Sequence, residues 1–210
     1  MRVEPLGESA LILRELPVAP YLAAKRIAHR FQSIFDVAPA YETVGVYFEG
    51  TPPSEADLLE AVSMELGDEA PRHHVIPVCY AMGEDLEDAA YTLGLPTETV
   101  ASLHSSKTYS CAAIGFCPGF PYLQRLDERI SGLPRRAAPR VRVEPGSVAI
   151  TGAQTGIYPL PRPGGWWLIG RTPLVLVDVE SGYFPISAGD SVAFRPIGEA
   201  EFERLNGGRL

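Results

Sequence analysis

The apolar residues of the first eighty positions repeat with two different spacings. Spacings of three and four predict amphipathic helices, one over residues 24–35 and one that begins near Ser54, where Ser54 and Asp57 resemble a capping box. Alternating apolar and polar residues predict short strands, over residues 2–5, 9–14, 41–48 and 73–80. This order of elements favours a compact α+β sandwich with helices packed on one sheet.

Helical spacing continues in two short segments and then disappears. Apolar stripes predict one helix over residues 86–93 and another after a cap at Thr97, with Val100 and Leu103 on its buried face. From residue 109 onward Gly/Pro turns separate β-rich segments, at residues 109–116, 141–143, 147–150, 166–169, 174–177 and 191–194. This pattern predicts a β-barrel or sandwich, so we divide the chain into an α+β domain (1–83) and a β domain (84–210).

An unusual loop begins at Gly115, where the sequence reads GFCPGFPYL. Pro118 and Pro121 fix the backbone angle φ and remove two backbone hydrogen-bond donors. Gly115 and Gly119 permit turns that a side chain would block. A stiff loop that carries three aromatic rings either lines a site or fills a structural corner, and we favour a functional loop.

Bulk composition excludes several classes of function. The chain has 210 residues, and 46% of them are hydrophobic, which is enough to form a buried core. Its net charge of −8 argues against nucleic-acid binding. Cys79, Cys111 and Cys117 lack disulfide or zinc spacing, and reduced thiols fit a cytoplasmic protein. Neither a signal peptide nor a membrane-spanning segment is expected.

Positive charge is concentrated between Gly115 and Val175. This segment has eight arginines and three carboxylates, a local charge of +5, which leaves −13 for the rest of the chain. Guanidinium groups match carboxylate and phosphate in bidentate geometry. The arginines therefore either hold an anionic ligand or pair with acids from the other half of the chain.

Two reactive side chains lie near this segment. Cys117 superficially matches a nucleophile elbow, but that elbow needs a backbone N–H on the next residue, and Pro118 has none. We therefore do not expect catalysis by Cys117. His104 follows Leu103 near a predicted helix end, where it either interacts with the terminal carbonyls or serves as a general base or ligand contact.

Other polar and aromatic residues could form a pocket for a small ligand. Gln154 and Thr155 supply amide and hydroxyl groups, while Tyr158 and Trp166 form an apolar wall or simply belong to the core. No set of His, Cys, Asp and Glu has the spacing of metal ligands. A phosphate-binding glycine motif is also absent from the sequence, so a nucleotide used here would be bound mainly by another polypeptide.

The order of these motifs resembles the 5-oxoprolinase B-subunit family, also called allophanate hydrolase subunit 1 or KipI-type kinase inhibitors. The resemblance covers nearly the whole chain and is carried by short motifs: Gly7-Glu-Ser-Ala-Leu11, Pro77-Val-Cys-Tyr80, Asp85-Leu86, Leu103-His104, the 115–123 loop, Pro134-Arg-Arg136, Pro139-Arg140, Gly146-Ser-Val148, Gln154-Thr-Gly-Ile-Tyr-Pro159, Pro163-Gly-Gly-Trp166, Gly170-Arg-Thr-Pro173 and Gly189-Asp190. Glu144-Pro145 and Arg162 depart from the family pattern.

The resemblance implies an N-terminal α+β domain and a C-terminal cyclophilin-like β-barrel. It also implies a complex with 5-oxoprolinase subunits A and C, which couples ATP hydrolysis to the opening of 5-oxo-L-proline to L-glutamate. For this reaction we expect catalytic roles for His104, Arg140 and Arg171. Substrate contacts are expected from six residues: Phe120, Tyr122, Gln154, Thr155, Tyr158 and Trp166. Inhibition of a sporulation histidine kinase and a role in urea or allophanate metabolism are the alternatives.

Overall fold

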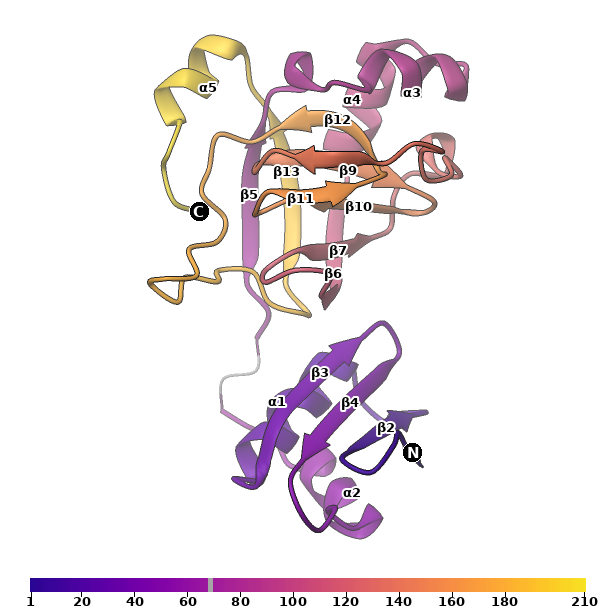
Figure 1. Ribbon diagram of the computed structural model, residues 1–210, viewed down its shortest axis with the longest axis vertical. Helices are drawn as coiled ribbons and strands as arrows, with labels where there is room; N and C mark the ends of the chain where they lie inside the picture. Colours follow the sequence, from indigo (N-terminus) through magenta and orange to yellow (C-terminus); the bar gives the residue numbers. More distant parts are fainter. Residues whose placement is uncertain (68–69) are drawn as a thin grey trace. The chain divides into compact units, whose positions relative to one another are not determined.

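The computed structural model describes residues 1–67 and 70–210, which fold as two compact units (Figure 1). Unit 1 comprises Met1–Pro71 and unit 2 comprises Arg72–Leu210. The sequence pattern assigned the strand that follows residue 72 to the first domain, and this assignment is wrong. The strand, β5 (His73–Val78), belongs to unit 2 because it pairs in parallel with β13 (Ser191–Pro196).

In residues 1–67, an antiparallel sheet packs against two helices. The sheet order is β1 (Arg2–Pro5), β2 (Ala10–Arg14), β4 (Thr43–Phe48) and β3 (Ile34–Ala40). Helices α1 (Pro20–Arg30) and α2 (Glu55–Ser63) share one apolar core with the sheet. The Asp57 amide donates to the Ser54 hydroxyl at 3.2 Å, which confirms the predicted cap of the second helix.

Helix α1 ends at Arg30, earlier than the apolar spacing predicted. Its next residue, Phe31, is extended, with φ −119° and ψ 117°. Ile34 and Phe35 continue the helical spacing but lie in β3, a strand that the sequence did not predict. β3 pairs with β4 across a tight turn at Tyr41, so cross-strand pairing outweighs the local helical pattern here.

Unit 2 is built on a sheet that is antiparallel except for its β5–β13 pair. Its order is β5, β13, β6 (Thr108–Ile114), β7 (Pro121–Gln124), β10 (Gln154–Ile157), β9 (Ser147–Thr151) and β12 (Trp167–Arg171). Backbone hydrogen bonds between Cys79 and Arg171, at 2.8 and 3.0 Å, join the end of β5 to β12. The sheet therefore closes on itself, which satisfies its edges as the predicted barrel requires.

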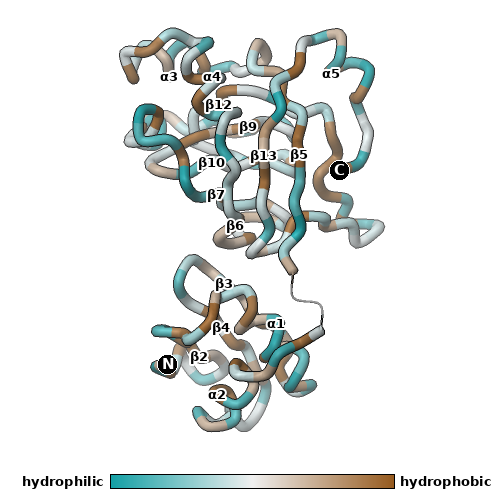
Figure 2. The backbone as a smooth tube through the Cα atoms, turned by 180° about the vertical axis from the view of Figure 1, so that it is seen from behind, coloured by the Kyte–Doolittle hydropathy of each residue, from teal (hydrophilic) through white to brown (hydrophobic). Residues whose placement is uncertain are grey.

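A separate two-stranded ribbon and several helices complete unit 2. The ribbon pairs β8 (Arg140–Val143) with β11 (Arg162–Gly164). The helical elements are η1 (Tyr80–Met82), α3 (Leu86–Leu93), α4 (Thr97–Ser105), η2 (Glu128–Ile130) and α5 (Glu199–Leu205). In Figure 2 the hydrophobic colour marks the middle of β13, whose Val192 and Phe194 belong to the main core.

Two details of unit 2 differ from the sequence prediction. Thr97 is the first helical residue of α4 rather than its cap, a position that Pro96 takes. Residues 174–177 form no regular strand, because Val175 makes only an isolated bridge to Arg209. None of the helices in the described ranges has both the length and the apolar character needed to cross a bilayer.

Candidate functional site

The aromatic loop predicted from the sequence connects β6 to β7. Its ends are tied together, because the Gly115 amide donates to the Phe120 carbonyl at 3.2 Å and the Phe120 amide donates to the Cys117 carbonyl at 3.1 Å. Phe116 has φ +65°, a left-handed conformation that costs energy in a bulky residue. Its ring remains 56% exposed. Strain of this kind is typical of functional loops.

A cavity of about 290 Å³ lies against this loop. Four of its walls are aromatic residues that the sequence singled out as substrate contacts: Phe120, Tyr122, Tyr158 and Trp166. The remaining lining residues are Phe116, Arg135, Arg136, Pro139, Pro163, Gly164 and Gly165. An aromatic cavity with a few charged groups is the usual composition of a small-molecule site.

Phe120 is the centre of the aromatic wall. Its ring makes edge-to-face contacts with Tyr122, Tyr158 and Trp166, with centroids 5.0, 5.2 and 5.4 Å away. Such contacts stabilise by more than the burial of area alone. Phe120 is only 2% exposed, so its ring supports the wall and belongs to a small core cluster at the same time.

Two glycines let the aromatic rings approach the backbone. A Cβ on Gly156 would lie 2.8 Å from Cζ of Phe120, closer than real side chains allow. A Cβ on Gly164 would overlap the hydroxyl of Tyr158. Both glycines belong to motifs that carry the family resemblance, and these close approaches are the physical reason for a glycine at each position.

Burial raises the pKa of Tyr158, which therefore keeps its proton at neutral pH. A hydrogen bond from the Trp166 amide and the positive charge of Arg135 oppose part of this rise. The guanidinium of Arg135 thus acts electrostatically on the aromatic wall.

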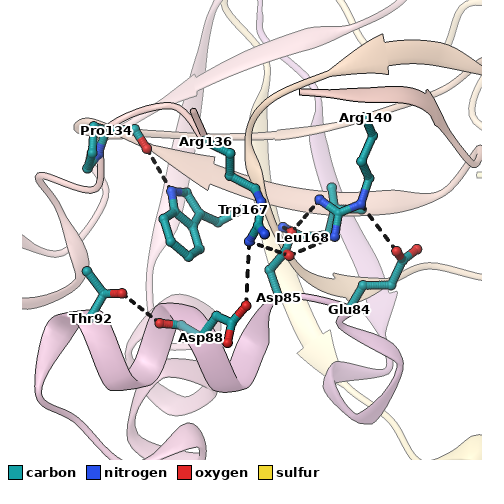
Figure 3. Close-up of polar contacts among 9 residues, drawn as sticks. All are labelled: Glu84, Asp85, Asp88, Thr92, Pro134, Arg136, Arg140, Trp167 and Leu168. Atoms are coloured by element: carbon teal, nitrogen blue, oxygen red, sulfur yellow. Dashed lines mark hydrogen bonds and ion pairs between the residues drawn. The ribbon is translucent and has the colours of Figure 1, made fainter. Parts of the chain in front are cut away.

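Residues 134–140 carry three arginines, and two of these, Arg135 and Arg136, line the cavity. One buried carboxylate, Asp85, holds this segment in place (Figure 3). Asp85 is 2% exposed and accepts hydrogen bonds from Arg136 at 2.6 Å and from Arg140 at 2.7 and 2.8 Å. A fourth bond, at 2.8 Å, comes from the backbone amide of Leu168 in β12. Charge-assisted bonds to a buried carboxylate hold the segment firmly against the barrel.

Trp167 contacts the N-terminal end of the same segment. Its indole N–H donates to the Pro134 carbonyl at 2.7 Å, and the guanidinium carbon of Arg136 lies 4.9 Å from the ring centroid (Figure 3). Arg135 lies between Pro134 and Arg136 and is exposed at the cavity.

Arg140 and Arg171, the two arginines predicted to be catalytic, do not line this cavity. Arg140 is engaged by Asp85 and also pairs with Glu84 at 3.3 Å. Arg171 ends β12, where its backbone bridges to Cys79. The pKa of Glu144 is lowered chiefly by a hydrogen bond from Arg142 and further by the charge of Arg171. Their catalytic roles remain predictions.

His104 likewise lies apart from the cavity, fully buried in the core. The Thr155 hydroxyl donates to the Ala149 carbonyl at 3.0 Å, so it accepts from Nε2 of His104 at 2.8 Å. Nδ1 of the ring then accepts from the Tyr80 hydroxyl at 2.6 Å. This network assigns the Nε2–H tautomer and uses both ring nitrogens. Thr155 therefore lies with His104 in the core and does not line the aromatic cavity.

Burial lowers the pKa of His104 from 6.5 to about 3. Between these two values the unfolded chain binds a proton that the folded chain excludes, so stability falls as the pH drops below 6.5. We expect His104 to contribute a loss of about 2 kcal/mol in the free energy of unfolding between pH 7 and pH 5.

Urea unfolding followed by the fluorescence of Trp166 and Trp167 measures this effect in unit 2. His104→Gln should be less stable at pH 7 but should show a flatter dependence on pH than the natural chain. The other titrating groups are common to both proteins, so the difference between the two curves isolates His104. Parallel curves would contradict the prediction.

Neither Cys111 nor Cys117 shows a sign of activation. Burial raises the pKa of Cys111 to about 12 and raises the pKa of Cys117, even though Arg162 lies close enough to oppose the latter. Cys117 packs in the small aromatic core cluster. A thiol with a raised pKa is a poor nucleophile, in agreement with the expectation from Pro118.

Gln154 lies at a second hollow of unit 2, beside Arg125 and Arg135. Of the six predicted substrate contacts, the four aromatic residues line the cavity, Thr155 lies in the core, and Gln154 lies at the second hollow. Among the residues that the structure describes, no group of three or more His, Cys, Asp and Glu side chains could hold a metal ion.

The sequence did not assign individual roles to four residues of the site: Phe116, Asp85, Arg135 and Arg136, the last two being predicted only as members of the arginine-rich segment that could hold an anion. A signal for each was nevertheless present, because Phe116 stands in the aromatic loop and the other three stand in motifs that carry the family resemblance. Their spatial roles depend on contacts that no local pattern reveals.

Comparison with known proteins identifies a family for this arrangement. Residues 1–184 match the model of the carboxyltransferase domain, subdomain C and D. The chain is 33% identical to the B subunit of 5-oxoprolinase from Bacillus subtilis, with 96% of this chain and 95% of the relative covered. It is 38% identical to the B subunit of 5-oxoprolinase from Escherichia coli O157:H7, with 91% and 94% covered.

Solved structures show the same fold. The crystal structure of TTHA0988 matches 90% of this chain with a TM-score of 0.79 and 34% identity, and the match spans 40% of the TTHA0988 chain. The urea amidolyase of Kluyveromyces lactis matches 97% of this chain with a TM-score of 0.68 and 18% identity, over 15% of its own length. In both proteins the fold is one part of a longer polypeptide.

Proposed function

The chain belongs to the 5-oxoprolinase B-subunit family, and on this basis we propose that it works in a complex that opens 5-oxo-L-proline to L-glutamate at the expense of ATP. The observation that carries the proposal is the identity of 33–38% to proteins of this name over nearly their whole length. Kinase inhibition and urea or allophanate metabolism are not favoured by these relatives.

The chemistry of the substrate explains why such a reaction needs ATP. A lactam is stabilised by resonance, so water attacks its carbonyl slowly. Transfer of a phosphoryl group from ATP to the carbonyl oxygen turns that oxygen into part of a leaving group and releases ADP. Water then adds to the carbon, and the C–N bond breaks to release the amine and leave an acyl phosphate. A second water molecule hydrolyses this acyl phosphate to inorganic phosphate and the carboxylate of glutamate. Fixed positive groups would stabilise the charge that develops on the oxygens.

The aromatic cavity suits the substrate that this chemistry requires. Its rings, centred on Phe120, offer apolar contact to a small five-membered ring, and its volume of about 290 Å³ matches a small metabolite. Arg135 offers a positive charge to the carboxylate of the substrate. We assign the ring to the aromatic walls and the carboxylate to the arginine side.

Several features of the complex follow from the family. Subunits A and C are the expected companions, and one of them would bind most of the ATP, since this chain has no phosphate-binding glycine motif. The closed sheet of unit 2 would be a cyclophilin-like barrel, and the complex would work in the cytoplasm. We retain His104, Arg140 and Arg171 only as residues that support the site through the barrel.

Reconstitution tests the proposal directly. The purified chain should show no ATP hydrolysis that depends on 5-oxoproline, whereas addition of subunits A and C should produce glutamate and ADP together. Phe116→Ala should raise the KM for 5-oxoproline about two- to tenfold, because one aromatic contact contributes about 0.5–1.5 kcal/mol. Its thermal midpoint should change little, since the ring is 56% exposed.

Tyr91→Ala is the matched control for Phe116→Ala, because the Tyr91 ring is 90% exposed on α3 and lies outside the cavity. This variant should turn over 5-oxoproline normally. If the reconstituted complex forms no glutamate, or if both variants raise KM equally, the assignment of function and cavity is overturned.

A further inference from the structure

A second hollow of about 700 Å³ adjoins the aromatic cavity and shares Arg135 with it. Its other polar side chains are Gln124, Arg125, Thr151 and Gln154. We call this hollow the arginine groove. None of its lining residues is a carboxylate, which is unusual in a chain that carries a net charge of −8.

The uncharged polar side chains of the groove come from residues that lie opposite one another on three neighbouring strands. Gln154 in β10 pairs with Gln124 in β7 on one side and with Thr151 in β9 on the other. Residues that are directly opposite on neighbouring strands place their side chains on the same face. The barrel therefore places the amides of Gln124 and Gln154 and the Thr151 hydroxyl on one face, where the hydroxyl donates to the Leu133 carbonyl at 3.2 Å. Arg125 directly follows Gln124.

The second arginine is positioned by a hydrogen-bonded loop. The Gly132 amide donates to the Gly152 carbonyl, and the Gly152 amide donates to the Leu133 carbonyl, both at 2.7 Å. These bonds fasten the loop that leads to Arg135 onto the turn between β9 and β10. The contacts of Asp85 with Arg136 and Arg140 fix the residues that follow it.

The two arginines of the groove differ from their neighbours in charge pairing. In the described residues, Arg129, Arg136, Arg140 and Arg142 each form an ion pair with a carboxylate. Neither Arg125 nor Arg135 has a carboxylate within ion-pair distance in those residues. Arg125 also has φ +78°, a strained conformation for a residue with a side chain. Two guanidinium groups without a carboxylate partner in the described residues match the charge and geometry of a phosphate group.

We propose that the arginine groove binds a phosphoryl group next to the substrate in the aromatic cavity. This inference rests on the proposed function and names the second ligand of the same site. Arg135 lines both hollows, so with the lactam ring against the aromatic walls its several N–H donors would bind the substrate carboxylate in one hollow and the phosphoryl group in the other. Arg125 and the Gln124 amide would bind the outer phosphate oxygens. The phosphoryl group comes either from the triphosphate of a nucleotide or from phosphate attached to or released from the lactam.

Calorimetric titration of the full chain with tripolyphosphate and with inorganic phosphate tests the groove without any turnover. Arg125→Gln combined with Arg135→Gln should weaken binding of tripolyphosphate at least tenfold, because two charge-assisted contacts are lost. Arg195→Gln is the matched control, since it removes an exposed arginine that pairs with Glu201 at 3.0 Å outside the groove. Its affinity should equal that of the natural chain.

The two probes distinguish the sources of the phosphoryl group. Binding of tripolyphosphate but not of inorganic phosphate assigns the groove to the nucleotide, and comparable binding of both assigns it to a single phosphoryl group. If the natural chain binds neither probe, or if the control variant weakens binding as much as the double variant, the inference is overturned. Tryptophan fluorescence shows that the variants are folded.

Turnover by the reconstituted complex separates the two proposals. The double variant should lose glutamate formation at least tenfold, while the control keeps it. Normal turnover by the double variant overturns the groove and leaves the oxoprolinase assignment intact. Absence of turnover in the natural complex, with the groove still binding tripolyphosphate, overturns the oxoprolinase assignment instead.

Discussion

Asp85→Asn should lower the free energy of unfolding of unit 2 by about 3 kcal/mol. The carboxylate accepts four hydrogen bonds while only 2% exposed, and three of them come from arginines. Removal of one partner of a buried ion pair typically costs about 3–5 kcal/mol, because the other charge is left without compensation. The lower end applies because Arg136 and Arg140 keep 28% and 23% side-chain exposure.

Urea unfolding followed by tryptophan fluorescence measures this loss, since both tryptophans of the chain, Trp166 and Trp167, lie in unit 2. Asp88→Asn is the control. Asp88 is 70% exposed and lies 3.7 Å from Arg136, so its removal should change stability by less than about 0.5 kcal/mol. Equal effects of the two substitutions would show that Asp85 does not act as the anchor.

Phe120→Ala should destabilise unit 2 by about 3–5 kcal/mol, the usual cost of removing a buried phenylalanine ring. The ring is 2% exposed and contacts three other aromatic side chains edge to face. Its loss also opens the wall of the cavity. We therefore expect weaker binding of 5-oxoproline under conditions in which the variant remains folded.

The same fluorescence assay checks this expectation, and the Tyr91→Ala variant again serves as the control. An exposed aromatic ring should contribute within about 0.5 kcal/mol. A loss below about 1 kcal/mol in Phe120→Ala would mean that the aromatic cluster rearranges freely. The cavity would then not be a preformed site.

Residues 134–140 contain arginines that stabilise the barrel and an arginine that is available to a ligand. Arg136 and Arg140 are fixed by Asp85, whereas Arg135 is left exposed between two hollows. A site that must hold an anion needs a guanidinium without a carboxylate partner and a backbone that cannot move away. The ion pairs of Arg136 and Arg140 with Asp85 supply that rigidity. The paired arginines therefore hold the backbone in place, and Arg135 remains to bind the anion.

Local patterns in the sequence determined the elements whose causes are local. The cap at Ser54 and the apolar stripe over Leu86–Leu93 depend on residues within one helical turn, and both helices are present. The Gly/Pro turns of the second half predicted a β-rich domain for the same reason. The aromatic loop was recognised because two prolines and two glycines exclude regular structure. Family membership also followed from the sequence, since it depends on the order of motifs.

Tertiary contacts decided the rest. β5 belongs to unit 2 because it pairs with β13, more than one hundred residues away. Asp85 meets Arg136 and Arg140 across separations of 51 and 55 residues, so no local pattern could distinguish these structural arginines from Arg135. His104 is a core residue because Tyr80 and Thr155 enclose it from distant elements. A sequence determines which side chains are available for chemistry, but the closure of the barrel determines which of them are satisfied internally and which are left to bind a ligand.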